Sequence, residues 1–101
     1  MISFAYKVNV PAHVLVRFLD KEAVLLNLET ERYFGLDETG ARMWQVATTA
    51  KNIEDACAQL LDEYEVEGET LRQNLNDLLE RLTENGLLTL APSDVGTAPT
   101  I

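Results

Sequence analysis

The apolar pattern of this 101-residue chain changes its period once, at Asp37. Before that point come short apolar runs that are typical of strands, HVLVRF, AVLLNL and RYFGL, with polar links between them. After it, apolar residues recur at helical spacing as far as the sequence NGLL. Strands that precede helices, instead of alternating with them, predict an α+β domain. We expect a three-stranded antiparallel sheet followed by three helices, with a winged helix-turn-helix-like outline.

Local signals mark where the predicted helices begin and end. Asp37 can cap the first helix, expected over roughly residues 38–48, and Asn52 can cap the second. Gly86, in the sequence ENG, provides a stop for the third. Apolar stripes at helical spacing indicate the buried faces of the last two helices. They are Ile53, Ala56, Cys57, Leu60, Leu61 and Tyr64 in one, and Leu71, Leu75, Leu78, Leu79 and Leu82 in the other.

The composition indicates a single folded unit. A chain of this length with 47% hydrophobic residues has enough apolar content for one core. We expect the folded domain over residues 13–90, preceded by an N-terminal extension or extra edge strand over residues 1–12. Residues 91–101, APSDVGTAPTI, are small, polar and proline-containing, which predicts a disordered tail.

Charge and cysteine content narrow the choice of partner and compartment. The formal net charge of -9 repels phosphate backbones and anionic lipids, so we expect neither nucleic acid nor a membrane as partner. Cys57 is the only cysteine, which excludes an internal disulfide, and the start MISFAYKVNVP lacks the pattern of a signal peptide. No apolar run approaches the roughly 20 residues that cross a bilayer. These features predict a soluble, cytoplasmic protein.

The residue types needed for catalysis or metal binding are sparse. His13 is the only histidine and Cys57 the only thiol, and they fall on a strand start and on an apolar helix stripe. That placement offers no pair of nucleophile and base. No zinc-site or EF-hand spacing is present. We therefore predict no catalytic activity, no cofactor and no metal. The acidic residues from Glu54 to Glu69 are interpreted as a solvated face, with a docking patch for a basic partner as the alternative.

Three stretches together resemble a known family. VLLNLETERYFGLDETGARMW, IEDACAQLLDEYEVEGETL and LLERLTENGLL stand in the order found in the PqqD family of pyrroloquinoline quinone (PQQ) biosynthesis. Its relatives are the RiPP recognition elements, which serve ribosomally synthesised and modified peptides. The resemblance covers residues 13–90, and NLETERYFGL resembles relatives found beside lasso-peptide and similar clusters more than it resembles the PQQ protein itself. It implies a non-catalytic peptide chaperone that binds the leader segment of a precursor peptide. The chaperone would present that peptide to a radical SAM enzyme, a protease or a cyclase.

Two aromatic residues stand side by side in RYFGL. Because side chains alternate along a strand, we expect Phe34 and Leu36 to face the core and Tyr33 to stay at the surface. The resemblance implies that the leader adds as an antiparallel strand beside RYFGL, in a cleft closed by the third helix. The predicted peptide-binding residues are Arg32, Tyr33, Phe34, Gly35, Leu36, Leu71, Arg72, Leu75 and Leu78. Glu31 occupies a turn position where relatives often carry glycine, which leaves the turn type and register open.

Alternative functions also fit the predicted elements. Three helices and a small sheet suit a winged-helix regulator or a general protein-interaction module. In the third helix, however, Arg72 and Arg81 stand among acidic side chains, which opposes contact with DNA. An open strand edge can also pair with a second copy of the chain, so we consider a homodimer through that edge as well.

Overall fold

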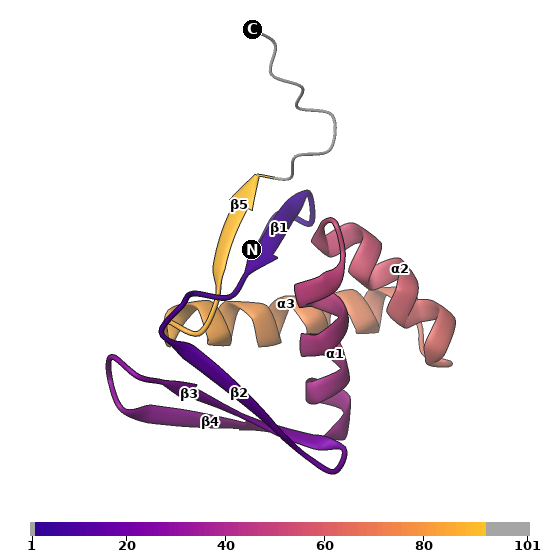
Figure 1. Ribbon diagram of the computed structural model, residues 1–101. Coiled ribbons are helices and arrows are strands. Elements are labelled where there is room, and N and C mark those ends of the chain that lie inside the picture. The colour runs from indigo at the N-terminus through magenta and orange to yellow at the C-terminus, as the bar shows by residue number, and fades with distance from the viewer. Residues whose placement is uncertain (1, 93–101) are drawn as a thin grey trace, which may run out of the picture.

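The computed structural model describes residues 2–92, which contain five strands and three helices (Figure 1). In chain order they are β1 (Tyr6–Asn9), β2 (Val14–Leu19), β3 (Glu22–Asn27), β4 (Arg32–Leu36), α1 (Glu38–Thr49), α2 (Ile53–Glu63), α3 (Gly68–Glu84) and β5 (Thr89–Pro92). The predicted α+β order is confirmed, because β2, β3 and β4 form an antiparallel sheet and the three helices follow it. The winged helix-turn-helix likeness is only loose, since this sheet precedes all three helices.

The sheet of β2, β3 and β4 has one covered face and one open face. On the covered face Leu25 lies opposite Phe34, and Leu25 is fully buried. On the open face Leu15, Leu26 and Tyr33 form a row across the three strands. Leu15 is 52% exposed there and Tyr33 77%. Among the described residues β4 pairs only with β3, so no strand occupies its second edge.

α1 and α2 start at the caps that the sequence indicates, and α1 packs on the inner face of the sheet. Asp37 Oδ1 accepts a hydrogen bond from the Gly40 amide at 2.8 Å, and Asn52 Oδ1 accepts one from the Asp55 amide at 2.8 Å. Each bond satisfies a first-turn donor that has no partner within the helix. α1 packs against β3 and β4 on one side and against α2 on the other, and α2 packs against α3.

The core lies between the covered face of the sheet and the helices. Its largest fully buried side chains are Leu25, Ile53, Leu60, Leu75, Leu79, Leu82, Leu87, Leu88, Val46 and Cys57. Cys57 is thus a core residue, as its place in the apolar stripe predicts. The stripe of α2 is narrower than expected, because Leu61 is 37% exposed. It follows fully buried Leu60 and is rotated by about 100° around the helix, away from the core.

The N-terminal segment pairs with the other end of the described chain. β1 and β5 form a separate antiparallel sheet (Figure 1). In this sheet Val8 lies opposite Leu90. Residues 1–12 therefore supply a strand, but it is not an extra edge of the sheet of β2, β3 and β4. Pro11 lies between β1 and β2, where its missing N–H and fixed φ favour a break in the strand.

The described chain ends in β5, which continues past the predicted domain boundary at residue 90. The predicted tail over 91–101 thus begins inside this strand, and residues 93–101 lie outside the described part of the chain. Within residues 2–92, no helix is both long and apolar enough to cross a membrane.

Candidate functional site

A hollow of about 1120 Å³ opens beside the hairpin that joins β3 to β4. One wall is formed by the end of β3, the hairpin and the start of β4, with Asn27, Glu29, Thr30, Arg32, Tyr33 and Phe34. The opposite wall is the last turn of α3 and the chain that leads into β5, residues 83–90. Pro11 and His13, between β1 and β2, complete the lining. We call this hollow the β4 groove; it brings together segments that are far apart in the sequence.

The predicted residues of β4 divide between the two faces as strand alternation requires. Tyr33 is 77% exposed, Phe34 is half-buried against the core, and Leu36 is 5% exposed. The prediction that the two aromatic side chains point to opposite faces is confirmed. Arg32, Tyr33 and Phe34 line the β4 groove, whereas Gly35 and Leu36 are not part of its lining. A Cβ added at Gly35 would meet nothing within 4 Å, so the strand is unobstructed there.

The first half of α3 does not line this groove, which corrects the predicted cleft. Leu71 and Leu75 are 3% and 0% exposed, so they belong to the core. Leu78 is half-buried, packs against the core and is absent from the groove lining. The reason is that α2 packs against α3 and the N-terminal segment joins it, with the Ile2 amide donating to Asn76 Oδ1 at 3.0 Å.

Arg72 is held at this closed end of α3. Its Nη1 donates to Glu54 Oε2 at 2.9 Å, and its guanidinium carbon lies 4.4 Å from the centre of the Phe4 ring. The hydrogen bonds from Arg72 to the Glu54 carboxylate raise the pKa of Arg72. Arg72 lines a second, smaller hollow, together with Ile2, Phe4, Glu69, Gln73 and Asn76. Arg32 and Arg72 therefore line two different hollows, and the structure does not bring them together as the sequence predicted.

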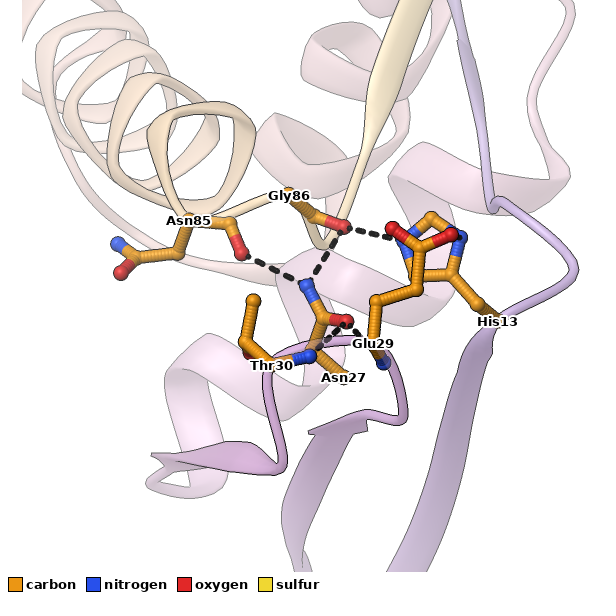
Figure 2. A network of polar contacts seen from close by, with 6 residues as sticks. All are labelled: His13, Asn27, Glu29, Thr30, Asn85 and Gly86. Carbon is orange, nitrogen blue, oxygen red and sulfur yellow. Dashed lines mark hydrogen bonds and ion pairs between the residues drawn. The ribbon is translucent and has the colours of Figure 1, made fainter.

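Sequence reasoning missed Asn27, which is only 3% exposed and connects both walls of the β4 groove (Figure 2). Its Oδ1 accepts hydrogen bonds from the amides of Glu29 at 2.9 Å and Thr30 at 3.3 Å. Its Nδ2 donates to the carbonyl oxygens of Asn85 at 3.1 Å and Gly86 at 3.4 Å. The hydrogen bonds within the hairpin had a signal in the sequence, because the side chain of an asparagine at the start of a turn often bonds the amide two residues on. The hydrogen bonds from Asn27 to the end of α3 had no such signal.

Gly86 and His13 complete this network of polar contacts (Figure 2). Gly86 has a φ of 72°, which glycine adopts without strain, and a Cβ there would lie 2.9 Å from Asn27 Nδ2. His13 Nε2 lies 3.2 Å from the Gly86 carbonyl oxygen, and its Nδ1 lies 3.6 Å from Glu29 Oε2. We refer to His13, Asn27, Glu29, Thr30, Asn85 and Gly86 as the Asn27 network.

The chemistry of the groove is that of a binding surface. It offers a strand edge that no other strand of residues 2–92 occupies, an exposed aromatic ring at Tyr33 and charged groups at Arg32 and Glu84. Cys57 does not line it, and burial raises the pKa of the Cys57 thiol, which disfavours the reactive thiolate. Among residues 2–92, no three His, Cys, Asp or Glu side chains are placed to hold a metal ion. The groove can hold an extended segment by its backbone and grip side chains at alternate positions.

Comparison with known proteins identifies the fold and the kind of protein. The family model described as coenzyme PQQ synthesis protein D (PqqD) matches residues 22–88. The structure of TbiB1 in complex with the TbiA(beta) leader peptide is 35% identical, with a TM-score of 0.74 over 79% of this chain and 93% of that one. The structure of lasso peptide synthetase B1 complexed with the leader peptide is 26% identical, with a TM-score of 0.71 over 82% and 98%. The comparison with curated proteins gave no match.

Proposed function

This chain belongs to the PqqD family, and we propose that it is a RiPP recognition element that binds the leader segment of a precursor peptide in the β4 groove. Two similar solved structures are complexes with leader peptides, which supports the choice of ligand. We further propose that the protein carries out no chemistry itself. It presents the peptide to a modifying enzyme in the cytoplasm, either a radical SAM enzyme, a protease or a cyclase.

The observation that carries this proposal is the edge of β4 inside the β4 groove, which no other described strand occupies. An added antiparallel strand would satisfy the main-chain groups of that edge, and residues 83–90 would face its other side. Alternate side chains of the leader would then point toward Tyr33 on the open face and toward Phe34 on the covered face. Main-chain bonds give affinity for many sequences, and these side-chain contacts give selectivity.

Charge in the groove orients the bound leader. Arg32 lies at the start of β4, and Glu84 lies across the groove at the end of α3. An acidic leader residue is favoured beside Arg32, and a basic one beside Glu84. Because these groups are at an exposed rim, their contribution is modest and falls with added salt.

Amide hydrogen exchange tests the binding mode directly. The ligand is a synthetic leader peptide from a short precursor gene, to be sought beside the gene for this protein, and the control is a scrambled peptide of the same composition. We expect new protection at residues 32–36 with the leader and none with the scrambled peptide. Protection confined to α2 would contradict the proposed groove. Titration with duplex DNA, from which the net charge of -9 predicts no binding, tests the regulator alternative.

A second copy of the chain would compete for the same strand edge. If β4 pairs with its equivalent in another molecule, the homodimer must separate before a leader can add to that edge. Size-exclusion chromatography with light scattering, run with and without leader, checks this. We expect leader binding to shift any dimer toward a monomeric complex; a dimer that persists at full leader occupancy would show that it uses another surface.

A further inference from the structure

Asn27 uses both ends of one amide to join the two walls of the β4 groove. Its oxygen holds the hairpin through the amides of Glu29 and Thr30, and its nitrogen holds the carbonyls that follow α3. The residue is 3% exposed, so water cannot easily replace these partners if the amide is lost. Figure 2 shows the amide between the hairpin and the end of α3.

The end of α3 is shaped to present these carbonyls. The Leu87 amide donates to the Leu82 oxygen at 2.9 Å and the Gly86 amide to the Thr83 oxygen at 3.1 Å, which closes the helix with Gly86 in the left-handed conformation. This termination uses the amides of the turn but leaves the oxygens of Asn85 and Gly86 for Asn27. A Cβ at position 86 would lie 2.9 Å from Asn27 Nδ2, so the approach requires glycine there.

A third segment is tied to the same point. His13 Nε2 lies 3.2 Å from the Gly86 oxygen, and the Leu28 amide donates to the His13 oxygen at 2.8 Å. The residue that precedes β2, the hairpin and the end of α3 therefore meet at the buried Asn27 amide and the Gly86 carbonyl. These three segments also line the groove.

We propose that Asn27 is a positioning residue that fixes the separation of the β4 edge and residues 83–90 before the leader arrives. This inference rests on the proposed function. A leader strand must fit between these walls, so walls held in place beforehand reduce the ordering cost of binding. Asn27 acts through the hairpin and the end of α3. If Asn27 lacks the Nδ2 donor, the hairpin keeps its turn, but the groove loses the hydrogen bonds that set its width.

The substitution Asn27→Asp separates the two halves of this role. An aspartate keeps an oxygen for the amides of Glu29 and Thr30, but at neutral pH it places a second oxygen, without a proton, against the carbonyls of Asn85 and Gly86. We expect the leader dissociation constant to rise about tenfold, equivalent to about 1.4 kcal/mol. Most of the change should lie in the dissociation rate. Amide exchange in the free protein should quicken at residues 85–88.

Acidification then provides a readout that lost stability alone would not give. Protonation of the introduced carboxyl restores an O–H donor toward Gly86. We expect the affinity of Asn27→Asp relative to the unmodified protein to recover as the pH falls. His13, Glu29, Arg32 and Glu84 face the same groove and are present in both proteins, so the two affinities are compared as a ratio at each pH. All measurements use conditions where circular dichroism shows full folding.

Cys57→Ala is the matched control, because it removes core contacts in α2 without touching the groove. We expect it to lower stability and leave leader affinity unchanged. Equal affinities of Asn27→Asp and the unmodified protein, a ratio that stays low in acid, or an equal loss in Cys57→Ala would each overturn the proposal. If the unmodified protein fails to bind leader, the proposed function itself fails. Should Asn27→Asp not fold, Gly86→Ala displaces the same amide, and undiminished leader binding by that variant overturns the inference.

Discussion

At its N-terminal end α3 is covered by α2 and joined by the first residues of the chain, whereas at its C-terminal end it borders the β4 groove. The apolar stripe of the helix runs through both ends. Leu71 and Leu75 at one end and Leu82 at the other are all buried, so hydrophobic pattern alone does not distinguish the two. The difference comes from what lies beside the helix. A ligand can bind only along the part of α3 that α2 and the N-terminal segment leave uncovered.

Polar groups reinforce the contrast. At the closed end, Arg72 bonds Glu54 and stacks on Phe4, so its charge serves contacts within the protein. At the open end, Asn27 bonds the backbone on both sides and leaves the edge of β4 facing the groove. Polar contacts at the N-terminal end of α3 cover the helix, whereas polar contacts at its C-terminal end hold the two walls of the β4 groove. Variants at the two ends should therefore divide between stability and binding.

Leu75→Ala is expected to have the largest effect, on stability. Leu75 is fully buried, and truncation of such a leucine costs about 2–5 kcal/mol. The folded fraction should bind leader with unchanged affinity, because Leu75 does not line the β4 groove. Urea unfolding and leader titration below the unfolding transition measure the two quantities. A large loss of affinity with little loss of stability would restore the first half of α3 as the ligand site.

Tyr33→Ala is expected to weaken leader binding and to leave stability almost unchanged. The ring is 77% exposed and lines the groove, so its removal should change stability by less than about 0.5 kcal/mol. Leader binding should weaken by about 2 kcal/mol, the usual size of an interface hot spot. Tyr6, which is 41% exposed on β1 and outside the groove lining, provides the matched control. If Tyr6→Ala weakens binding as much as Tyr33→Ala, the loss does not come from the groove.

Arg72 and Arg32 allow the two ends of α3 to be compared by removal of a charge at each. Arg72→Ala should lower stability by about 0.2–1 kcal/mol, the range for exposed ion pairs, and leave leader affinity unchanged. Arg32→Ala should leave stability unchanged and weaken the binding of an acidic leader, by an amount that shrinks as salt rises. Calorimetry at two salt concentrations distinguishes them. A reversed result, with leader binding sensitive to Arg72, would contradict the separation of the two ends.

The sequence predicted those features that depend on neighbours along the chain. The caps at Asp37 and Asn52 and the division of Tyr33 from Phe34 are set within a few residues, and all are confirmed. The position of the groove was not predictable in this way. It depends on contacts such as Ile2 with Asn76 and Asn27 with Asn85, 74 and 58 residues apart. Hydrophobic periodicity marks a buried stripe but carries no information about which distant segment covers each turn.

The hairpin at the groove allows the smallest prediction, because the register that the sequence left open is now defined. Asn27 lies opposite Arg32, and the Glu31 amide donates to the backbone carbonyl oxygen of Asn27 at 2.8 Å. Glu31 has a φ of 61°. For a residue with a Cβ this left-handed conformation costs about 1–2 kcal/mol.

Glu31→Gly removes the strain but adds freedom to the unfolded chain, at a cost of about 0.5–1 kcal/mol. We expect a net gain in stability of about 0.5 kcal/mol, seen as a higher urea midpoint with unchanged slope. Leader affinity should stay the same, since Glu31 is absent from the groove lining. Asp20, also at a φ of 61° but in the turn between β2 and β3, is the comparison variant, and Asp20→Gly should give a smaller gain because aspartate adopts this conformation more readily than glutamate. If Asp20→Gly stabilises and Glu31→Gly does not, the Glu31 side chain stabilises the hairpin enough to offset its strained backbone, and the turn at the groove is held by more than the Asn27 amide.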